Sequence, residues 1–156
     1  MLKALPGFHA ISGCDATVSF LNKGKIRPFA VMGKTKKFLQ AISVLSEDGN
    51  LQQNTFNDIG DFVCSLYGFP NISSVDEARI RMFEQKYAPK NERDPLTGIT
   101  VINPSLMPPC QRVLQQNIRR ADFVARAWKN AHKAMLSPGN PLDCGWILKN
   151  GEYSIK

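Results

Sequence analysis

The 156-residue sequence lacks the features that mark secreted and membrane-spanning proteins. Its first residues form no apolar run long enough for a signal peptide. No segment approaches the ~20 consecutive apolar residues that a transmembrane helix needs. The four cysteines lie 34 to 50 residues apart and form no C-x-x-C pair, so neither a zinc site nor a disulfide framework is favoured. We therefore expect an intracellular protein, in the nucleus or the cytoplasm, with no membrane partner.

Internal repeats and low-complexity tracts are also absent, and the composition is that of a folded protein. Hydrophobic residues make up 43% of the chain and charged residues 21%, which argues against disorder. A chain of this length can bury the core of one domain.

Positive charge is concentrated in two segments of the chain. The net charge is +7, to which residues 1–40 contribute +6, residues 41–108 −4 and residues 109–134 +5. Clustered cations displace counterions together, so this pattern suits a polyanion such as the backbone of DNA or RNA. The alternative is that these cations serve solubility alone. The N-terminal candidates are Lys23, Lys25, Arg27, Lys34, Lys36 and Lys37.

Apolar spacing predicts a mainly α fold of about five helices with a small C-terminal β-hairpin. Asn150-Gly151, which accepts positive φ in a type I′ turn, marks the hairpin within residues 144–156. We divide the chain into a helical unit (1–87), a connector with four prolines (88–108) and a long helix plus hairpin (109–156), packed as one domain. The predicted elements are a short helix or strand at 2–12, a short segment around Pro28, helices at 34–46 and 54–68, a further helix, a short strand at 99–102 and a helix at roughly 109–135. The further helix is capped by Ser73 or Ser74, with Glu77 completing an S-x-x-E box from Ser74.

The predicted helix at 109–135 has two distinct faces. On one face, apolar residues alternate at spacings of four and three. On the other, cations recur every seven residues, and because seven residues advance a helix by ~700°, ~20° short of two turns, they form one basic stripe. The stripe is either a second polyanion contact or the solvated back of the helix. The apolar face is Leu114, Ile118, Ala121, Ala125, Trp128, His132 and Met135, and the basic stripe is Arg112, Arg119, Arg126 and Lys133.

The segment Phe8–Lys25, FHAISGCDATVSFLNKGK, carries the strongest functional signal. It places a lone carboxylate, Asp15, at the end of an apolar element, where a rigid oxygen ligand for Mg²⁺ is useful in phosphodiester hydrolysis. A lysine-flanked glycine turn follows, and such turns grip nucleic-acid phosphates through backbone N–H groups. The alternative for Asp15 is an ordinary turn or helix-capping role. We expect His9, His132 and both tryptophans, Trp128 and Trp146, to be packed in the core rather than catalytic or base-stacking.

This segment resembles the FHAISGCDTTS…GKGK signature of a large metazoan family associated with mobile elements. The resemblance extends along the whole chain. Two departures are Ala16 in place of the first threonine after the aspartate, and Asn22 in place of the glycine before Lys-Gly-Lys. The later matching features are Phe62-Val63-Cys64, Tyr67-Gly68, Pro108-Pro109-Cys110, Arg120-Ala121, Trp128 and Cys144-Gly145-Trp146.

The signature in turn resembles the Gly-Cys-Asp region of flap-endonuclease-type enzymes of the PIN-like superfamily. That resemblance implies that Asp15 is a metal ligand and that Lys23, Gly24 and Lys25 form a phosphate-gripping turn. Such nucleases use several carboxylates, however, and none of the fourteen residues before Asp15 is acidic. A single carboxylate cannot hold two Mg²⁺ ions.

We therefore expect a non-catalytic, nucleic-acid-associated C-terminal part of a longer nuclease-like protein, with the upstream part of the same protein as a partner. One alternative is a helical protein-interaction or structural module without nucleic-acid binding. Another is an active metal nuclease that takes its remaining carboxylates from elsewhere.

Overall fold

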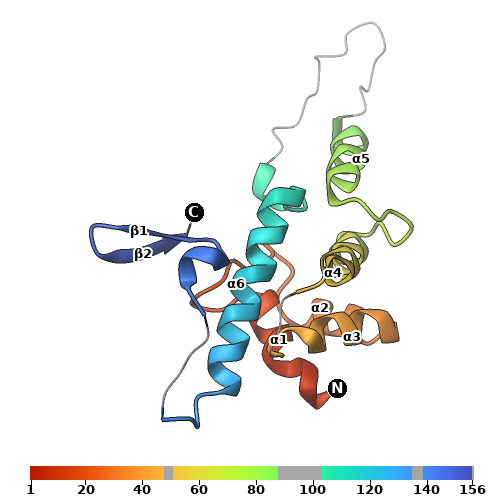
Figure 1. Cartoon of the computed structure of the whole chain (residues 1–156). Coiled ribbons are helices and arrows are strands. Elements are labelled where there is room, and N and C mark those ends of the chain that lie inside the picture. The colour runs from red at the N-terminus through yellow and green to blue at the C-terminus, as the bar shows by residue number, and fades with distance from the viewer. Residues whose placement is uncertain (48–50, 88–102, 135–138, 156) are drawn as a thin grey trace, which may run out of the picture.

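The structure, a computed structural model, describes residues 1–47, 51–87, 103–134 and 139–155. In these ranges six α-helices precede a two-stranded antiparallel sheet, which confirms the mainly α class and the C-terminal hairpin (Figure 1). The same residues contain no helix that is long and apolar enough to cross a membrane. The elements are α1 (Leu5–Ile11), α2 (Ile26–Met32), α3 (Lys36–Val44), α4 (Gln53–Leu66), α5 (Val75–Tyr87), α6 (Gln111–Lys129), β1 (Trp146–Lys149) and β2 (Glu152–Ile155), with short 3-10 turns at Leu2–Ala4, Pro104–Leu106 and Pro141–Cys144.

The sixth helix is α2, which the sequence analysis treated only as a short segment around Pro28. Proline is compatible with this helix because it occupies the third helical position, where the backbone N–H has no acceptor within the helix. The short element at 2–12 is helical, as α1. The strand expected at 99–102 lies outside the described residues.

Side-chain caps fix the starts of two helices. The Ser74 hydroxyl accepts a hydrogen bond from the Glu77 N–H at 3.3 Å before α5, as the S-x-x-E pattern predicts. The Thr35 hydroxyl accepts one from the Phe38 N–H at 3.2 Å and caps α3. Each cap satisfies a donor that the helix itself leaves without a partner.

Helix α6 runs through the middle of the molecule and packs against α1 and α4 (Figure 1). Four residues of its predicted apolar face, Leu114, Ile118, Ala121 and Ala125, are fully buried. Helix α1 in turn approaches α3 closely at Gly7, where a Cβ atom would lie 2.4 Å from the Ile42 carbonyl oxygen. Only glycine permits that approach.

The end of α6 differs from the prediction. The helix stops at Lys129, and Trp128, expected in the core, is 42% exposed. His132 is exposed beyond the helix end, and Met135 lies outside the described residues. The apolar spacing continues past Ala125, but the ring of Trp128 lies beside His9 of α1 and is partly open to solvent.

The hairpin forms around the predicted Asn150-Gly151 turn, with Trp146 opposite Ile155 and Leu148 opposite Tyr153. Asn150 (φ 50°) and Gly151 (φ 85°) make the turn with positive φ at both central residues, typical of type I′. The half-buried Trp146 ring packs on Phe123 of α6 at a centroid distance of 5.1 Å. The far end of the hairpin stands away from the helices (Figure 1).

Candidate functional site

The Gly-Cys-Asp segment closes the C-terminal end of α1. Thr17 Oγ1 donates a hydrogen bond to the Ala10 carbonyl oxygen at 2.5 Å. Lys25 Nζ lies 2.6 Å from the carbonyl oxygen of Gly13, 3.2 Å from that of His9 and 3.0 Å from Ser12 Oγ. Carbonyls at a helix C-terminus need such donors, and a cation there also complements the helix dipole. The lysine of the Lys-Gly-Lys turn therefore has a structural role in capping α1.

Gly13 is required by the geometry of this closure. Its φ is +105°, and a Cβ atom would lie 2.4 Å from Cβ of Ser19. The chain then turns sharply, because Cys14 and Thr17 exchange backbone hydrogen bonds at 3.1 and 3.3 Å. Asp15 occupies the tip of this turn and is exposed.

The Asp15 turn borders a hollow of about 440 Å³ that is also lined by His9, Cys14, Lys25 and Trp128. The imidazole of His9 lies 5.2 Å from the Trp128 ring, with the two planes tilted by 36°. Asp15 and Lys25 thus border the same hollow. Its lining also includes His9 and Trp128, which sequence spacing placed in the core.

The residues of this hollow do not fit a two-metal centre. Within the described ranges, no group of three or more His, Cys, Asp or Glu side chains is arranged to hold a metal ion. Mg²⁺ prefers several oxygen ligands, and Asp15 is the one carboxylate that lines the hollow. No catalytic step through a metal follows from this arrangement.

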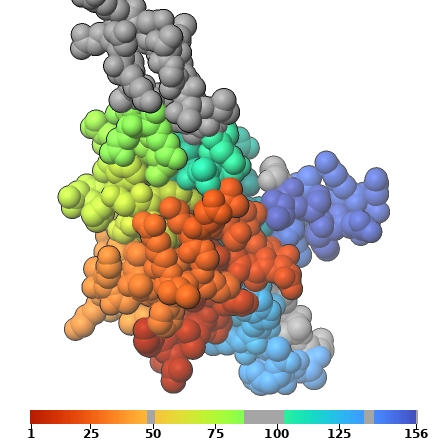
Figure 2. All heavy atoms as spheres, turned by 180° about the vertical axis from the view of Figure 1, so that it is seen from behind, coloured from red at the N-terminus to blue at the C-terminus, as the bar shows by residue number. Residues whose placement is uncertain are grey.

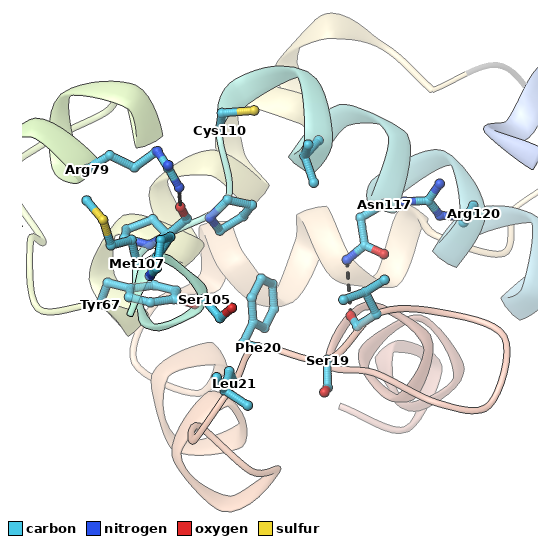
Figure 3. Close-up of a pocket in the computed structure, with 15 residues that line it drawn as sticks. Ser19, Phe20, Leu21, Tyr67, Arg79, Ser105, Met107, Cys110, Asn117 and Arg120 are labelled. Carbon is cyan, nitrogen blue, oxygen red and sulfur yellow. Dashed lines mark hydrogen bonds between the residues drawn. The ribbon is translucent and has the colours of Figure 1, made fainter. Parts of the chain in front are cut away.

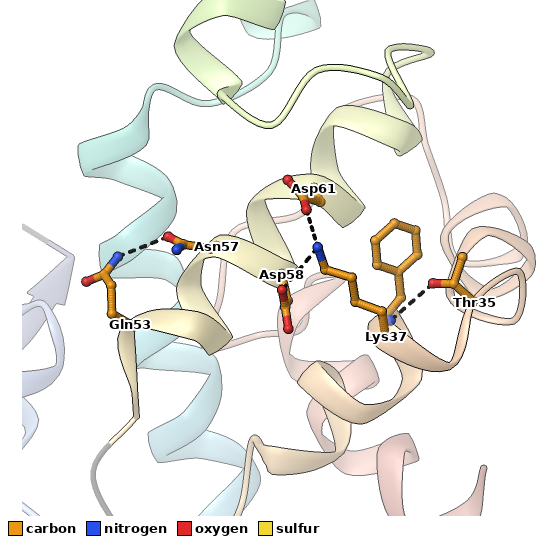
Figure 4. A network of polar contacts seen from close by, with 7 residues as sticks. Thr35, Lys37, Gln53, Asn57, Asp58 and Asp61 are labelled. Atoms are coloured by element: carbon orange, nitrogen blue, oxygen red, sulfur yellow. Dashed lines mark hydrogen bonds and ion pairs between the residues drawn. The ribbon is translucent and has the colours of Figure 1, made fainter.

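Two of the N-terminal cations are held by other parts of the protein. Burial lowers the pKa of Lys25, whose ammonium faces three oxygen acceptors. Lys37 Nζ lies 2.5 Å from Asp61 Oδ2 and 3.2 Å from Asp58 Oδ1 (Figure 4). The hydrogen bond that Lys37 donates to Asp61 raises the pKa of Lys37. Both side chains would have to give up these contacts to bind phosphate.

Three neighbouring cations are free of such contacts. Arg27 on α2, Lys34 in the following turn and Lys36 at the start of α3 are exposed, and no carboxylate of the described residues forms a salt bridge with them. We call these three residues the unpaired cations. Figure 2 shows residues 1–47, coloured red to orange, spread over the centre and lower part of one face of the molecule. The unpaired cations belong to this segment of the chain.

Lys23 belongs to a second group of cations. Its Nζ lies 4.3 Å from the centre of the Tyr67 ring, a cation–π contact. Burial lowers the pKa of Lys23, and repulsion from the charges of Arg27 and Lys86 lowers it further. We call Lys23, Arg27 and Lys86 the cation cluster. Lys86 comes from the acidic segment of the chain, 63 residues after Lys23, and no sequence signal indicates that it joins the group.

The basic stripe predicted on α6 is not continuous. Arg112 is exposed, but the guanidinium of Arg119 lies 5.7 Å from the Phe56 ring centre. Arg126 pairs with the buried carboxylate of Asp122 at 2.6 Å, and Lys133 follows the helix end. Arg126 is neutralised because Asp122 is buried on α6, where it also accepts a hydrogen bond from the Ser46 N–H at 3.1 Å.

No protein family model, curated protein or solved structure matches the chain. A functional assignment therefore rests on the contacts of its own residues.

Proposed function

We propose that this chain binds the sugar-phosphate backbone of nucleic acid without cleaving it. The observation that carries the proposal is the contrast between adjacent lysines at the start of α3. Lys37 is neutralised by Asp58 and Asp61, whereas the exposed Lys36 has no salt bridge to the described residues. Unneutralised cations that lie close together are the basis of backbone binding.

The positions of these cations support the same conclusion. Arg27 lies in the first turn of α2 and Lys36 in that of α3, and neither first turn contains an acidic residue. A cation near a helix N-terminus opposes the helix dipole and costs about 0.3–1 kcal/mol. A cation in such an unfavourable position is expected at functional sites. An approaching phosphate would reverse the penalty by supplying the missing negative charge.

The binding half of the proposal is tested with a fluorescently labelled single strand and a labelled duplex at several salt concentrations. We expect weak, sequence-independent binding, with Kd of about 1–100 µM near physiological salt, that weakens steadily as salt increases. Absence of binding at low salt, or affinity that does not depend on salt, would contradict the proposal.

The non-catalytic half is tested by incubating the protein with flap, single-stranded and duplex DNA in Mg²⁺ or Mn²⁺. Because Asp15 lacks partner carboxylates among the described residues, we expect no cleavage above background. Cleavage that is lost in Asp15→Asn would overturn this half and restore Asp15 as a metal ligand.

A second candidate function, a protein-interaction module, is favoured by the hairpin. Leu148 and Tyr153 face each other across the strands and are 54% and 56% exposed. Both strands also have an open edge in the described sheet, to which an extended peptide can add. Loss of a co-purified partner in Leu148→Ser with unchanged nucleic-acid affinity would support this function, and retention of the partner would oppose it.

A further inference from the structure

Trp128, near the end of α6, combines an accessible ring with a concave surrounding. The side chain is 42% exposed, and it lines the hollow of about 440 Å³ beside the Asp15 turn. We call this the Trp128 hollow. Its volume is within the range of ligand pockets, about 300–1,000 Å³. The exposed His9 ring lies beside it, at a centroid distance of 5.2 Å from the Trp128 ring. Aromatic side chains in a hollow suit a ligand with a flat apolar face.

A larger hollow, of about 580 Å³ beside the Val18–Leu21 loop, offers no comparable ring (Figure 3). Its aromatic side chains, Phe20 and Tyr67, are each 6% exposed. They also pack edge to face on each other at a centroid distance of 6.3 Å. An aromatic ring is therefore more accessible to a ligand in the Trp128 hollow than in the larger one.

Two oppositely charged side chains in the lining decide what chemical group can enter the Trp128 hollow. Asp15 is exposed, and it is the one carboxylate among the described residues that line the hollow. The ammonium of Lys25 is already held by three oxygen atoms at the C-terminal end of α1. A phosphate in the hollow would meet the negative charge of Asp15 without a free lysine to offset it. An uncharged group that donates a hydrogen bond would instead be accepted by the carboxylate.

The chain around the hollow nevertheless favours an anionic partner. Residues 1–40 hold seven basic residues, and Asp15 is their one acid. Arg27, one of the unpaired cations, follows the lining residue Lys25 by two positions, which is a backbone distance of at most about 7 Å. An unpaired cation thus lies close to the hollow in the chain but is not part of its lining.

We propose that the Trp128 hollow receives one unpaired nucleobase of a single strand, stacked on the Trp128 ring, while phosphates of the same strand contact the unpaired cations. Every nucleobase has a face that stacks on an aromatic ring, and an N–H on its edge that Asp15 can accept. A duplex keeps its bases paired and stacked, so it offers only its backbone. A basic peptide also suits a tryptophan and a carboxylate, but the positive charge of residues 1–40 repels it. This inference rests on the proposed function and names its substrate class.

Tryptophan fluorescence tests the stacking contact directly. The chain has two tryptophans, so Trp128 is the only one that remains in Trp146→Phe. A single-stranded oligonucleotide should quench the emission of this variant, and an abasic strand of the same length and charge should leave it unchanged. If both strands bind but the normal strand does not quench, or both quench equally, the inference is overturned and backbone binding stays intact. Binding of neither strand would overturn the proposed function as well.

Affinity measurements on two leucine variants give an independent check. Trp128→Leu removes the ring from the hollow, and Tyr153→Leu removes a ring of similar exposure (56%) from the hairpin as the control. Trp128→Leu should lower the affinity for the normal strand about 10-fold, since the stacking of one base is worth about that factor. It should leave the affinity for the abasic strand unchanged, and Tyr153→Leu should change neither.

Two results of these measurements would contradict the inference. One is an affinity for the normal strand that Trp128→Leu leaves unchanged, or lowers no more than the affinity for the abasic strand. The other is a basic peptide that binds the parent protein more tightly than the strand does and loses that affinity in Trp128→Leu. The second result would assign the Trp128 hollow to a cationic peptide.

Discussion

Neighbouring cations in the N-terminal segment have different contacts and therefore different expected roles. The Lys25 ammonium donates hydrogen bonds to oxygen atoms at the C-terminal end of α1. The Lys37 ammonium instead pairs with two aspartates of α4. Lys36, one residue away, is exposed. Substitutions at these positions should separate folding from binding.

The first prediction contrasts Lys25→Met with Lys36→Met. Loss of the Lys25 ammonium leaves the carbonyls at the end of α1 without that donor, so we expect a loss of about 1–2 kcal/mol in the free energy of unfolding. Lys36→Met should stay within about 0.5 kcal/mol of the parent. Urea denaturation measures both, and equal losses would contradict a capping role for Lys25.

The second prediction concerns the pH dependence of stability. Burial raises the pKa of the Cys64 thiol from 9.0 to about 11 and that of Tyr67 from 10.0 to about 12. Folding therefore favours the protonated forms, and their contribution is complete below pH 9 and lost as pH rises through the folded-state pKa values. The free energy of unfolding should decline above about pH 9.

The matched variant for this prediction is Cys64→Ala, which should show a shallower alkaline decline than the parent. Cys64 should also be the slowest thiol to react with N-ethylmaleimide at neutral pH, because it is fully buried and little thiolate forms. Peptide mass mapping measures the order of labelling. Rapid labelling of Cys64 ahead of Cys14 and Cys110 would show that its surroundings are open.

At the scale of elements, α6 organises the fold through four fully buried residues on one face. The third prediction compares Ile118→Ala with Trp128→Ala. Ile118 is 0% exposed and its truncation should cost about 2–4 kcal/mol, whereas the 42% exposed Trp128 should cost about 1 kcal/mol. Thermal denaturation of both variants provides the comparison. A larger loss for Trp128→Ala would place that ring in the core after all.

Local sequence signals predicted the elements correctly where the residues that form the sequence pattern also make the predicted contacts in the fold. The Ser74 cap, the Asn150-Gly151 turn and the face through Ile118 all follow from short-range chemistry. The sequence did not predict the exposure of the end of α6. The apolar spacing continues through Trp128, but that ring lies at the edge of α1, beside His9. Helix α2 was missed because its proline obscures a helical start.

The candidate site was less predictable than the fold. Sequence spacing grouped six N-terminal cations but did not separate Lys25 and Lys37 from the others, since their partners lie 12 and 24 residues away. Lys86 was missed for the same reason: only the packing of α5 brings it near Lys23. The buried contact of Asn117 with the Val18 carbonyl likewise depends on which side of α6 faces the Val18–Leu21 loop.

At the scale of the whole molecule, much of the positive charge is concentrated in the N-terminal segment of the chain. Residues 1–40 hold seven basic residues and one acidic residue, and this segment covers much of the face seen in Figure 2. Of its lysines, Lys37 is the one neutralised by salt bridges from α4 within the described residues. The central claim is that the unpaired cations, Arg27, Lys34 and Lys36, bind the nucleic-acid backbone.

The most direct test is the salt dependence of single-strand affinity in two triple variants of equal charge. Arg27→Ala/Lys34→Ala/Lys36→Ala removes the unpaired cations, and Arg112→Ala/Lys133→Ala/Lys149→Ala removes three exposed cations elsewhere. Each lost phosphate contact lowers the magnitude of the log–log salt slope by about 0.7 on a single strand, so the first variant should lose about 2 units and the second well under 1. An unchanged slope in the first variant, or equal changes in both, would contradict the claim that these three residues form the interface.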